Sequence, residues 1–132
     1  MDLSAFMKDY ADQINGQYTE FSNSQSVIIV PVGGGRFQTV LGIIKQSESK
    51  SGKIITLASK VSEYRSDFDF QMLLEQTAHF NYSRFVIRDG YLQVEAVSAL
   101  DGISEDAIKE LVQEVANLAD QYEMKLTGAD VN

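Results

Sequence analysis

The chain contains no cysteine and no tryptophan, and it has one histidine and one proline among its 132 residues. Without cysteine, disulfides, thiolate metal sites and thiol catalysis are excluded. The single histidine, His79, cannot form a site with several histidine ligands. It cannot complete a hydrolytic triad either, because the chain has no G-x-S-x-G nucleophile motif. We therefore predict a non-enzymatic protein with no catalytic, metal-binding or cofactor-binding residue and no cofactor, in which His79 is a partly exposed helical residue.

Long apolar runs are also missing. No run reaches the roughly 18 apolar residues of a membrane-spanning helix. The first residues, MDLSAFMKDYADQ, show neither the basic region nor the apolar region of a secretory signal. These two absences lead us to expect a cytoplasmic protein that does not attach to a membrane.

Basic residues are scarce, with 11 lysines and arginines against 19 acidic residues and a formal charge of −8. Proteins that bind nucleic acid cluster their basic residues, because counterions are released when these residues neutralise phosphates. Tyr82, Phe85 and Tyr91 are the aromatic residues that could stack on bases, but no basic groove accompanies them. We expect them to pack in the sheet, and we expect no nucleic-acid partner.

The clearest local signal lies at residues 82–98, where two strand-forming runs are joined by Asp89-Gly90. An Asp-Gly pair between alternating apolar residues favours a two-residue hairpin turn, because such a tight turn needs a positive φ, which Gly adopts without steric cost. On the mixed face of this hairpin, Arg84 or Arg88 could pair with Glu95 across the strands. We expect this face to be solvated and the other face to be apolar.

Periodicity and capping residues indicate the remaining elements. Apolar residues spaced by three and four predict a helix over residues 2–22, although Gly16 is a possible break. Asp69 is the expected N-cap of a second helix, and Ser104 is the expected N-cap of the last. Runs rich in β-branched residues predict three further strands, over residues 27–32, 37–45 and 53–62. The second helix is expected over residues 70–80.

Two patterns resemble ligand sites but have simpler explanations. Gly33-Gly34-Gly35 follows a strand, as a phosphate-binding loop does, yet a second strand follows and neither phosphate-loop pattern is complete. We expect a hairpin turn there. Asp67 and Asp69 could bind a cation, but no loop with the spacing of a calcium site surrounds them. Helix capping accounts for Asp69.

These elements predict an α+β fold in the order α-β-β-β-α-β-β-α. The sheet is expected to have five mainly antiparallel strands, with the helices packed mainly on one face. The length and the 44% apolar share suit a single domain over residues 1–132. Residues 127–132 are expected to form a frayed tail.

The element order resembles that of the type III secretion chaperone-like superfamily, which includes the YbjN-type bacterial domains. The resemblance spans residues 3–126 and is best over residues 73–126, where a short helix, a D-G hairpin and a capped long helix follow each other. The run G-R-x-Q-x-V at Gly35, Arg36, Gln38 and Val40 is similar to that of the YbjN-type branch. The triple glycine departs from the secretion chaperones.

The resemblance implies a chaperone-like or adaptor domain that binds protein and has no enzymatic activity. Members often form homodimers, and the secretion chaperones hold an extended segment of a partner along apolar patches and sheet edges. One alternative is a small-molecule sensor or regulatory domain of profilin-like or roadblock-like shape, in which two strands precede the middle helix. Another is an enzyme with several carboxylates in a deep pocket.

Overall fold

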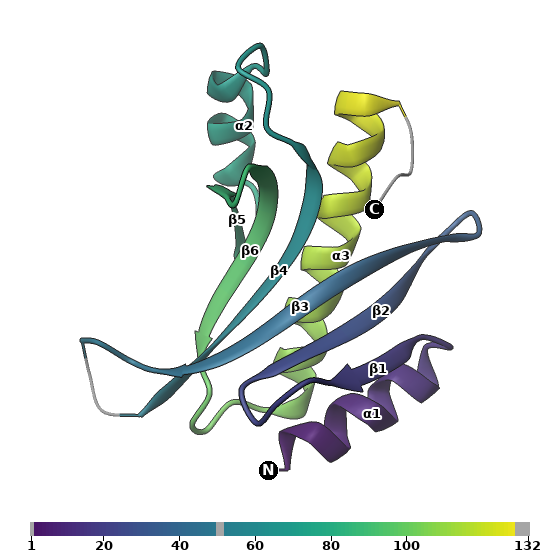
Figure 1. Ribbon diagram of the computed structural model, residues 1–132, viewed down its shortest axis with the longest axis vertical. Coiled ribbons are helices and arrows are strands. Elements are labelled where there is room, and N and C mark those ends of the chain that lie inside the picture. The colour runs from purple at the N-terminus through teal and green to yellow at the C-terminus, as the bar shows by residue number, and fades with distance from the viewer. Residues whose placement is uncertain (1, 50–51, 129–132) are drawn as a thin grey trace.

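The computed structural model describes residues 2–49 and 52–128. Its helices and strands, in chain order, are α1 (Leu3–Gln13), β1 (Gln17–Glu20), β2 (Gln25–Gly33), β3 (Arg36–Gln46), β4 (Lys53–Glu63), α2 (Phe70–Thr77), β5 (Ser83–Arg88), β6 (Tyr91–Ala99) and α3 (Glu105–Thr127). All neighbouring strands are antiparallel, and they form one six-stranded sheet in the order β1-β2-β3-β4-β6-β5 (Figure 1). The α+β class and the antiparallel sheet agree with the prediction.

The strand count differs from the prediction, because the expected helix over residues 2–22 ends early. Helix α1 stops at Gln13, and residues 17–20 form the extra strand β1. Asn15 adopts a positive φ of 60°, which a helix does not allow. Gly16 then lies so close to the backbone of β2 that an added Cβ would collide with the carbonyl oxygen of Ile29. The element order is therefore α-β-β-β-β-α-β-β-α, with six strands in place of five.

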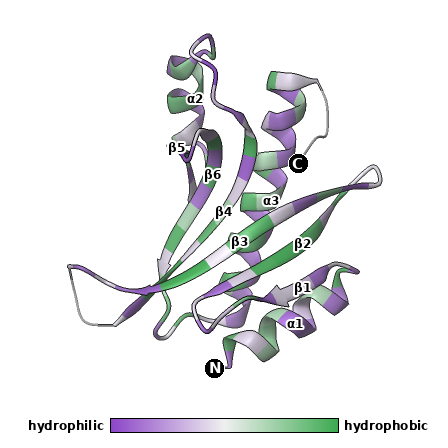
Figure 2. Ribbon diagram, in the orientation of Figure 1, coloured by the Kyte–Doolittle hydropathy of each residue, from purple (hydrophilic) through white to green (hydrophobic). Residues whose placement is uncertain are grey.

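The three helices pack against one face of the sheet. In Figure 1, α3 runs behind the strands, and the face toward the viewer carries no helix. Alternate residues of β2 and β3, such as Ile28, Val30 and Val40, point to the helical face and are almost completely buried. They join one core cluster with apolar residues of all three helices. Figure 2 shows the hydrophobic character of the middle of β2 and β3.

The predicted caps and turns are present. Asp69 accepts a hydrogen bond from the backbone N–H of Met72, and Ser104 accepts one from that of Ala107. Asp89 and Gly90, with φ of 55° and 80°, form the two-residue turn between β5 and β6. The triple glycine forms a hairpin turn, because Gly33, the last residue of β2, pairs with Arg36, the first residue of β3.

The C-terminal helix is slightly longer than predicted. Thr127, assigned to the frayed tail, is the last residue of α3, and Gly128 caps the helix in the left-handed conformation. The rest of the predicted tail, residues 129–132, lies outside the described residues. Among the described residues, no helix is both long enough and apolar enough to cross a membrane.

Candidate functional site

The sheet face without helices carries a hollow of about 490 Å³ between β3, β4 and the β5–β6 hairpin. We call it the sheet hollow. The residues that line it are Gln38, Thr39, Leu41, Ile43, Thr56, Ala58, Lys60, Arg88, Asp89 and Gln93. Its floor comes from residues that face each other across β3 and β4, since Leu41 pairs with Ala58 and Ile43 pairs with Thr56. Phe37 and Val97 lie on the same face and are 50% and 41% exposed.

The hollow lies where β3 and β4 separate. Their ladder runs from Leu41 to the end of β3, and the first part of β3 has no β4 partner in it. The buried side chain of Gln38 spans the gap, with Nε2 donating to Ser59 Oγ at 3.0 Å and to the carbonyl of Lys60 at 2.9 Å. Ser59 Oγ in turn donates to the carbonyl of Thr39 at 2.6 Å. Side chains thus replace the missing backbone hydrogen bonds at this point of the sheet.

A charge cluster lies beside the hollow on β5 and β6. Arg84 Nη2 lies 2.9 Å from Glu95 Oε1, and Arg88 Nη1 lies 2.5 Å from Glu95 Oε2. Only one of the two arginines was expected to pair with Glu95, and both do. Burial alone would raise the pKa of Glu95, which is 1% exposed, but the hydrogen bonds and charges of Arg88 and Arg84 outweigh it and lower the pKa. Glu95 is therefore a buried anion held between two partly exposed cations.

Lys60 supplies a further positive charge at the same end of the hollow. Its ammonium lies 4.1 Å from the centroid of the Tyr91 ring, in a cation–π contact. Within residues 2–49 and 52–128, no carboxylate forms a salt bridge with Lys60. Lys60 is exposed, so its ammonium is accessible from solvent.

Charge is segregated between the two layers of the molecule. The three helices carry nine acidic and three basic side chains, whereas the six strands carry six basic and three acidic ones. The net charge of −8 therefore conceals a helical layer that is strongly acidic and a sheet that is basic. Arg36 pairs with Asp120 of α3, and the other five basic residues of the strands still outnumber their three acidic ones. A partner that approaches the strands therefore meets a different electrostatic potential from one that approaches the helices.

The edge strand β5 carries a second candidate surface. β5 is the last strand of the sheet, and a groove of about 260 Å³ separates it from α2. We call this the α2 groove. Its lining is almost entirely apolar and consists of Phe70, Leu73, Leu74, Phe85, Val86, Ile87 and Leu92. Leu74 is 68% exposed and Ile87 is 54% exposed, so the groove opens to solvent.

The register of the hairpin determines which backbone groups of β5 face outward. Arg88 and Tyr91 flank the two-residue turn and pair with each other, so they exchange hydrogen bonds. Since bonded residues alternate along an antiparallel strand, Arg84 and Val86 also bond to β6. Phe85 and Ile87 then direct their N–H and C=O groups away from the sheet. The same two residues line the α2 groove.

The opposite edge of the sheet is better protected. β1 has four residues, QYTE, and its last residue, Glu20, is charged and accepts a hydrogen bond from Ser4 of α1. A short, charged edge strand is a common protection against pairing with another chain. β5 also carries charged residues, Arg84 and Arg88, but both pair with Glu95 of the neighbouring strand. It is two residues longer than β1 and has an exposed apolar groove beside it, so we consider it the better edge for strand addition.

Glu114 of α3 positions the loop that leads into β5. Its carboxylate accepts hydrogen bonds from the backbone N–H groups of Asn81 and Tyr82, at 2.9 and 2.8 Å, and from Ser83 Oγ at 2.6 Å. The Tyr82 hydroxyl donates to Glu110, and this hydrogen bond raises the pKa of Tyr82. The start of the edge strand is therefore attached to the long helix.

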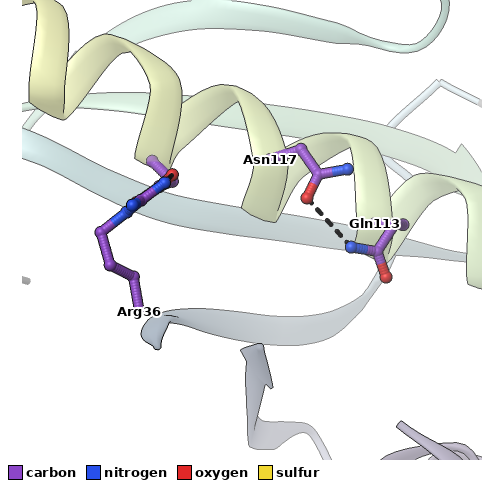
Figure 3. A network of polar contacts seen from close by, with 4 residues as sticks. Arg36, Gln113 and Asn117 are labelled. Carbon is purple, nitrogen blue, oxygen red and sulfur yellow. Dashed lines mark hydrogen bonds and ion pairs between the residues drawn. The ribbon is translucent and has the colours of Figure 1, made fainter. Parts of the chain in front are cut away.

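The run G-R-x-Q-x-V, which carried part of the family resemblance, has structural roles in this fold. Figure 3 shows the Arg36 side chain extending from the start of β3 toward α3, which also carries Gln113 and Asn117. Arg36 forms a two-fold hydrogen bond with Asp120 of that helix, at 3.0 and 2.9 Å. Gln38 spans the gap to β4, and Val40 is buried in the core.

The residues considered as ligands in the sequence are not brought together. His79 is exposed beyond the end of α2, Asp69 caps that helix, and Asp67 pairs with Arg65, which lowers its pKa. No group of three or more potential metal ligands exists among the described residues. The three aromatic residues considered for base stacking also lie apart. Phe85 packs on Phe80 and Tyr122, Tyr82 bonds to Glu110, and Tyr91 lies under Lys60.

Sequence reasoning did not single out Gln38, Lys60, Leu74 or Ile87 as functional residues. Lys60 and Gln93 face each other across β4 and β6, but only the register brings them together. The exposure of Leu74 carries no sequence signal, because its apolar side chain follows the helical pattern that normally marks a buried face. In comparisons with known proteins, no family model matches the chain, and no curated protein matches it either.

Proposed function

We propose that this chain is a non-enzymatic protein-binding domain of the chaperone-like or adaptor kind, acting in the cytoplasm. It holds an extended segment of a protein partner against the free edge of β5, with side chains of that segment in the α2 groove. The observation that carries the proposal is that Phe85 and Ile87 present outward backbone groups and also line this groove. Strand addition needs both features, because backbone hydrogen bonds supply affinity and pockets supply specificity.

The resemblance to the type III secretion chaperone-like superfamily implies the same mode of binding. We keep the membership itself, and the YbjN-type branch within it, as part of the proposal. Of the alternatives, the profilin-like or roadblock-like shape expects two strands before the middle helix, whereas four strands precede α2 here. An enzyme with several carboxylates needs a deep acidic pocket. The sheet hollow is lined by one carboxylate, Asp89. A second pocket, of about 590 Å³ between α1 and the start of α3, is lined by Asp2, Asp9 and Glu105, and all three are exposed.

Affinity capture from cells that naturally contain the protein tests the proposal. The full chain is immobilised as wild type and as Leu74→Ser, Ile87→Pro and Phe21→Ser. Ile87→Pro removes one outward N–H group and leaves the hydrogen bonds to β6 in place. Leu74→Ser removes an apolar wall of the groove. Phe21→Ser is the matched control, since Phe21 is 66% exposed but lies outside the groove.

We expect a specific protein to be retained by the wild type and by Phe21→Ser and to be lost by the other two variants. Circular dichroism establishes that each variant is folded. If all four proteins retain the same set, or if no protein is retained specifically, the proposed surface is wrong. The predicted homodimer is a separate question, which light scattering of the wild type in solution answers directly.

A further inference from the structure

The sheet hollow has the composition of a site for an amphipathic ligand. Its floor is formed by Leu41, Ile43 and Ala58 together with the methyl groups of Thr39 and Thr56. Its volume of about 490 Å³ lies within the range of roughly 300–1,000 Å³ that is usual for small-molecule sites. The α2 groove is smaller and lies on the helical side of β5, so the two surfaces can bind different ligands.

One end of the hollow is cationic. Lys60 has no carboxylate partner among the described residues, and Arg88 uses one nitrogen for Glu95, which leaves other N–H donors of its guanidinium. Gln93, between them, is 8% exposed and donates to the carbonyl of Arg88 at 3.2 Å. The basic side chains near this end are Lys60, Arg84 and Arg88, and the carboxylates are Asp89 and Glu95. Positive charges therefore outnumber negative ones by three to two.

One residue that lines the hollow, Gln38, is a buried polar side chain. Gln38 is 1% exposed, and its Nε2 is held by Ser59 Oγ and by the carbonyl of Lys60. Because both acceptors are part of β4, the backbone next to Lys60 is held in place by the same network. The backbone that carries the cationic end is therefore already ordered, so less conformational entropy is lost when a ligand binds there.

We propose that the sheet hollow binds a small amphipathic carboxylate, with its apolar chain on the floor and its carboxylate between Lys60 and Arg88. The apolar floor selects the chain, and the two cations select the charge of the head group. The sheet face is suited to a small molecule because backbone hydrogen bonding is available at a sheet edge and not on its face. The proposal does not depend on the protein partner described above.

Isothermal titration calorimetry of the full chain tests the charge preference. The ligands are octanoate, octan-1-ol and octyltrimethylammonium, which share one apolar chain and differ in head group. We expect octanoate to bind and the cation not to bind. Affinity should rise by about fourfold for each added methylene from hexanoate to octanoate, as expected for burial of a CH₂ group. Equal binding of the anion and the cation, or no binding of octanoate at millimolar concentration, would overturn the proposal.

Two lysine variants on β4 locate the site. Lys60→Gln should weaken octanoate binding by about tenfold, the size expected for one charge-assisted hydrogen bond. Lys53→Gln changes the net charge equally, but Lys53 does not line the hollow, so its affinity should equal that of the wild type. Equal weakening in both variants would show a nonspecific effect of charge and would refute the site.

Chemical-shift mapping with octanoate distinguishes the two surfaces. We expect the largest amide shifts at Ile43, Thr56 and Ala58, and small shifts at Leu74 and Ile87. The reverse pattern would assign the ligand to the α2 groove. If Lys60→Gln also abolishes capture of the protein partner, the hollow belongs to the protein interface and the small-ligand proposal is wrong. The proposed protein-binding function would then survive on its own experiment.

Discussion

Removing the carboxylate of Glu95 should cost less stability than removing its two arginine partners. Glu95 is 1% exposed, whereas the side chains of Arg84 and Arg88 are 60% and 46% exposed. In Glu95→Gln the amide oxygen still accepts a hydrogen bond from one guanidinium, while the other guanidinium returns to water. The variant therefore loses one hydrogen bond and, in the other, the difference between a charged and a neutral acceptor. We expect a loss of about 2 kcal/mol in the free energy of unfolding.

The double variant Arg84→Met/Arg88→Met keeps the apolar part of both side chains but leaves a buried carboxylate without a cation. Breaking a buried ion pair by removing one side typically costs about 3–5 kcal/mol. Urea denaturation of both variants and the wild type at neutral pH measures the two losses. A larger loss in Glu95→Gln than in the double variant would refute this reasoning.

The pH dependence provides an independent measurement on the same cluster. The pKa of Glu95 is lowered in the folded protein, so its stabilisation is present above the ordinary glutamate pKa of about 4.3 and is lost as pH falls through the lowered value. In the double variant, burial acts alone and raises the pKa of Glu95. The stability gap between wild type and double variant should therefore narrow as the solution is acidified. A gap that stays constant from neutral to acidic pH would contradict the assignment.

Two further predictions concern the backbone. Glu114→Ala should lower the free energy of unfolding by about 2 kcal/mol. The backbone N–H groups of Asn81 and Tyr82, which are exposed, and the part-buried hydroxyl of Ser83 at the start of β5 lose their acceptor. Hydrogen exchange of the amides of Asn81 and Tyr82 should accelerate, and unchanged exchange would contradict the role of Glu114. Gly16→Ala should destabilise the protein more than Gly35→Ala, because the former creates a backbone collision. The added methyl group of Gly35→Ala meets no other atom, so this variant loses only the roughly 1–2 kcal/mol that a non-glycine residue costs in the left-handed conformation. Urea denaturation compares the two, and equal costs would contradict this account.

Local features of this fold could be predicted because their causes are local. The turn at Asp89-Gly90 needs two positive φ values, which neighbouring residues do not change. Asp69 and Ser104 cap helices through hydrogen bonds to N–H groups three residues away. The hairpin of the triple glycine could be recognised for the same reason.

The first strand could not be predicted in this way. Ile14, Tyr18 and Phe21 continue the helical spacing of α1, so the periodic signal favoured one long helix. The helix ends where Asn15 adopts a positive φ, and Gly16 then lies close to the carbonyl oxygen of Ile29, in a strand that comes later in the chain. Phe21 then lies 66% exposed, although its spacing indicated a buried face.

The sequence by itself determined the turns, the helix caps, the alternation of buried residues along the strands and the overall acidity. These follow from steric limits and hydrogen bonds between residues close in the chain. Only the tertiary structure decided that β5 is a free edge, that one sheet face lacks helices, and that Lys60 and Arg88 border the same hollow. Those features depend on the order and register of the strands, which are set by contacts between distant segments. The two proposed binding surfaces consist of such contacts, and for that reason no motif in the sequence marked them.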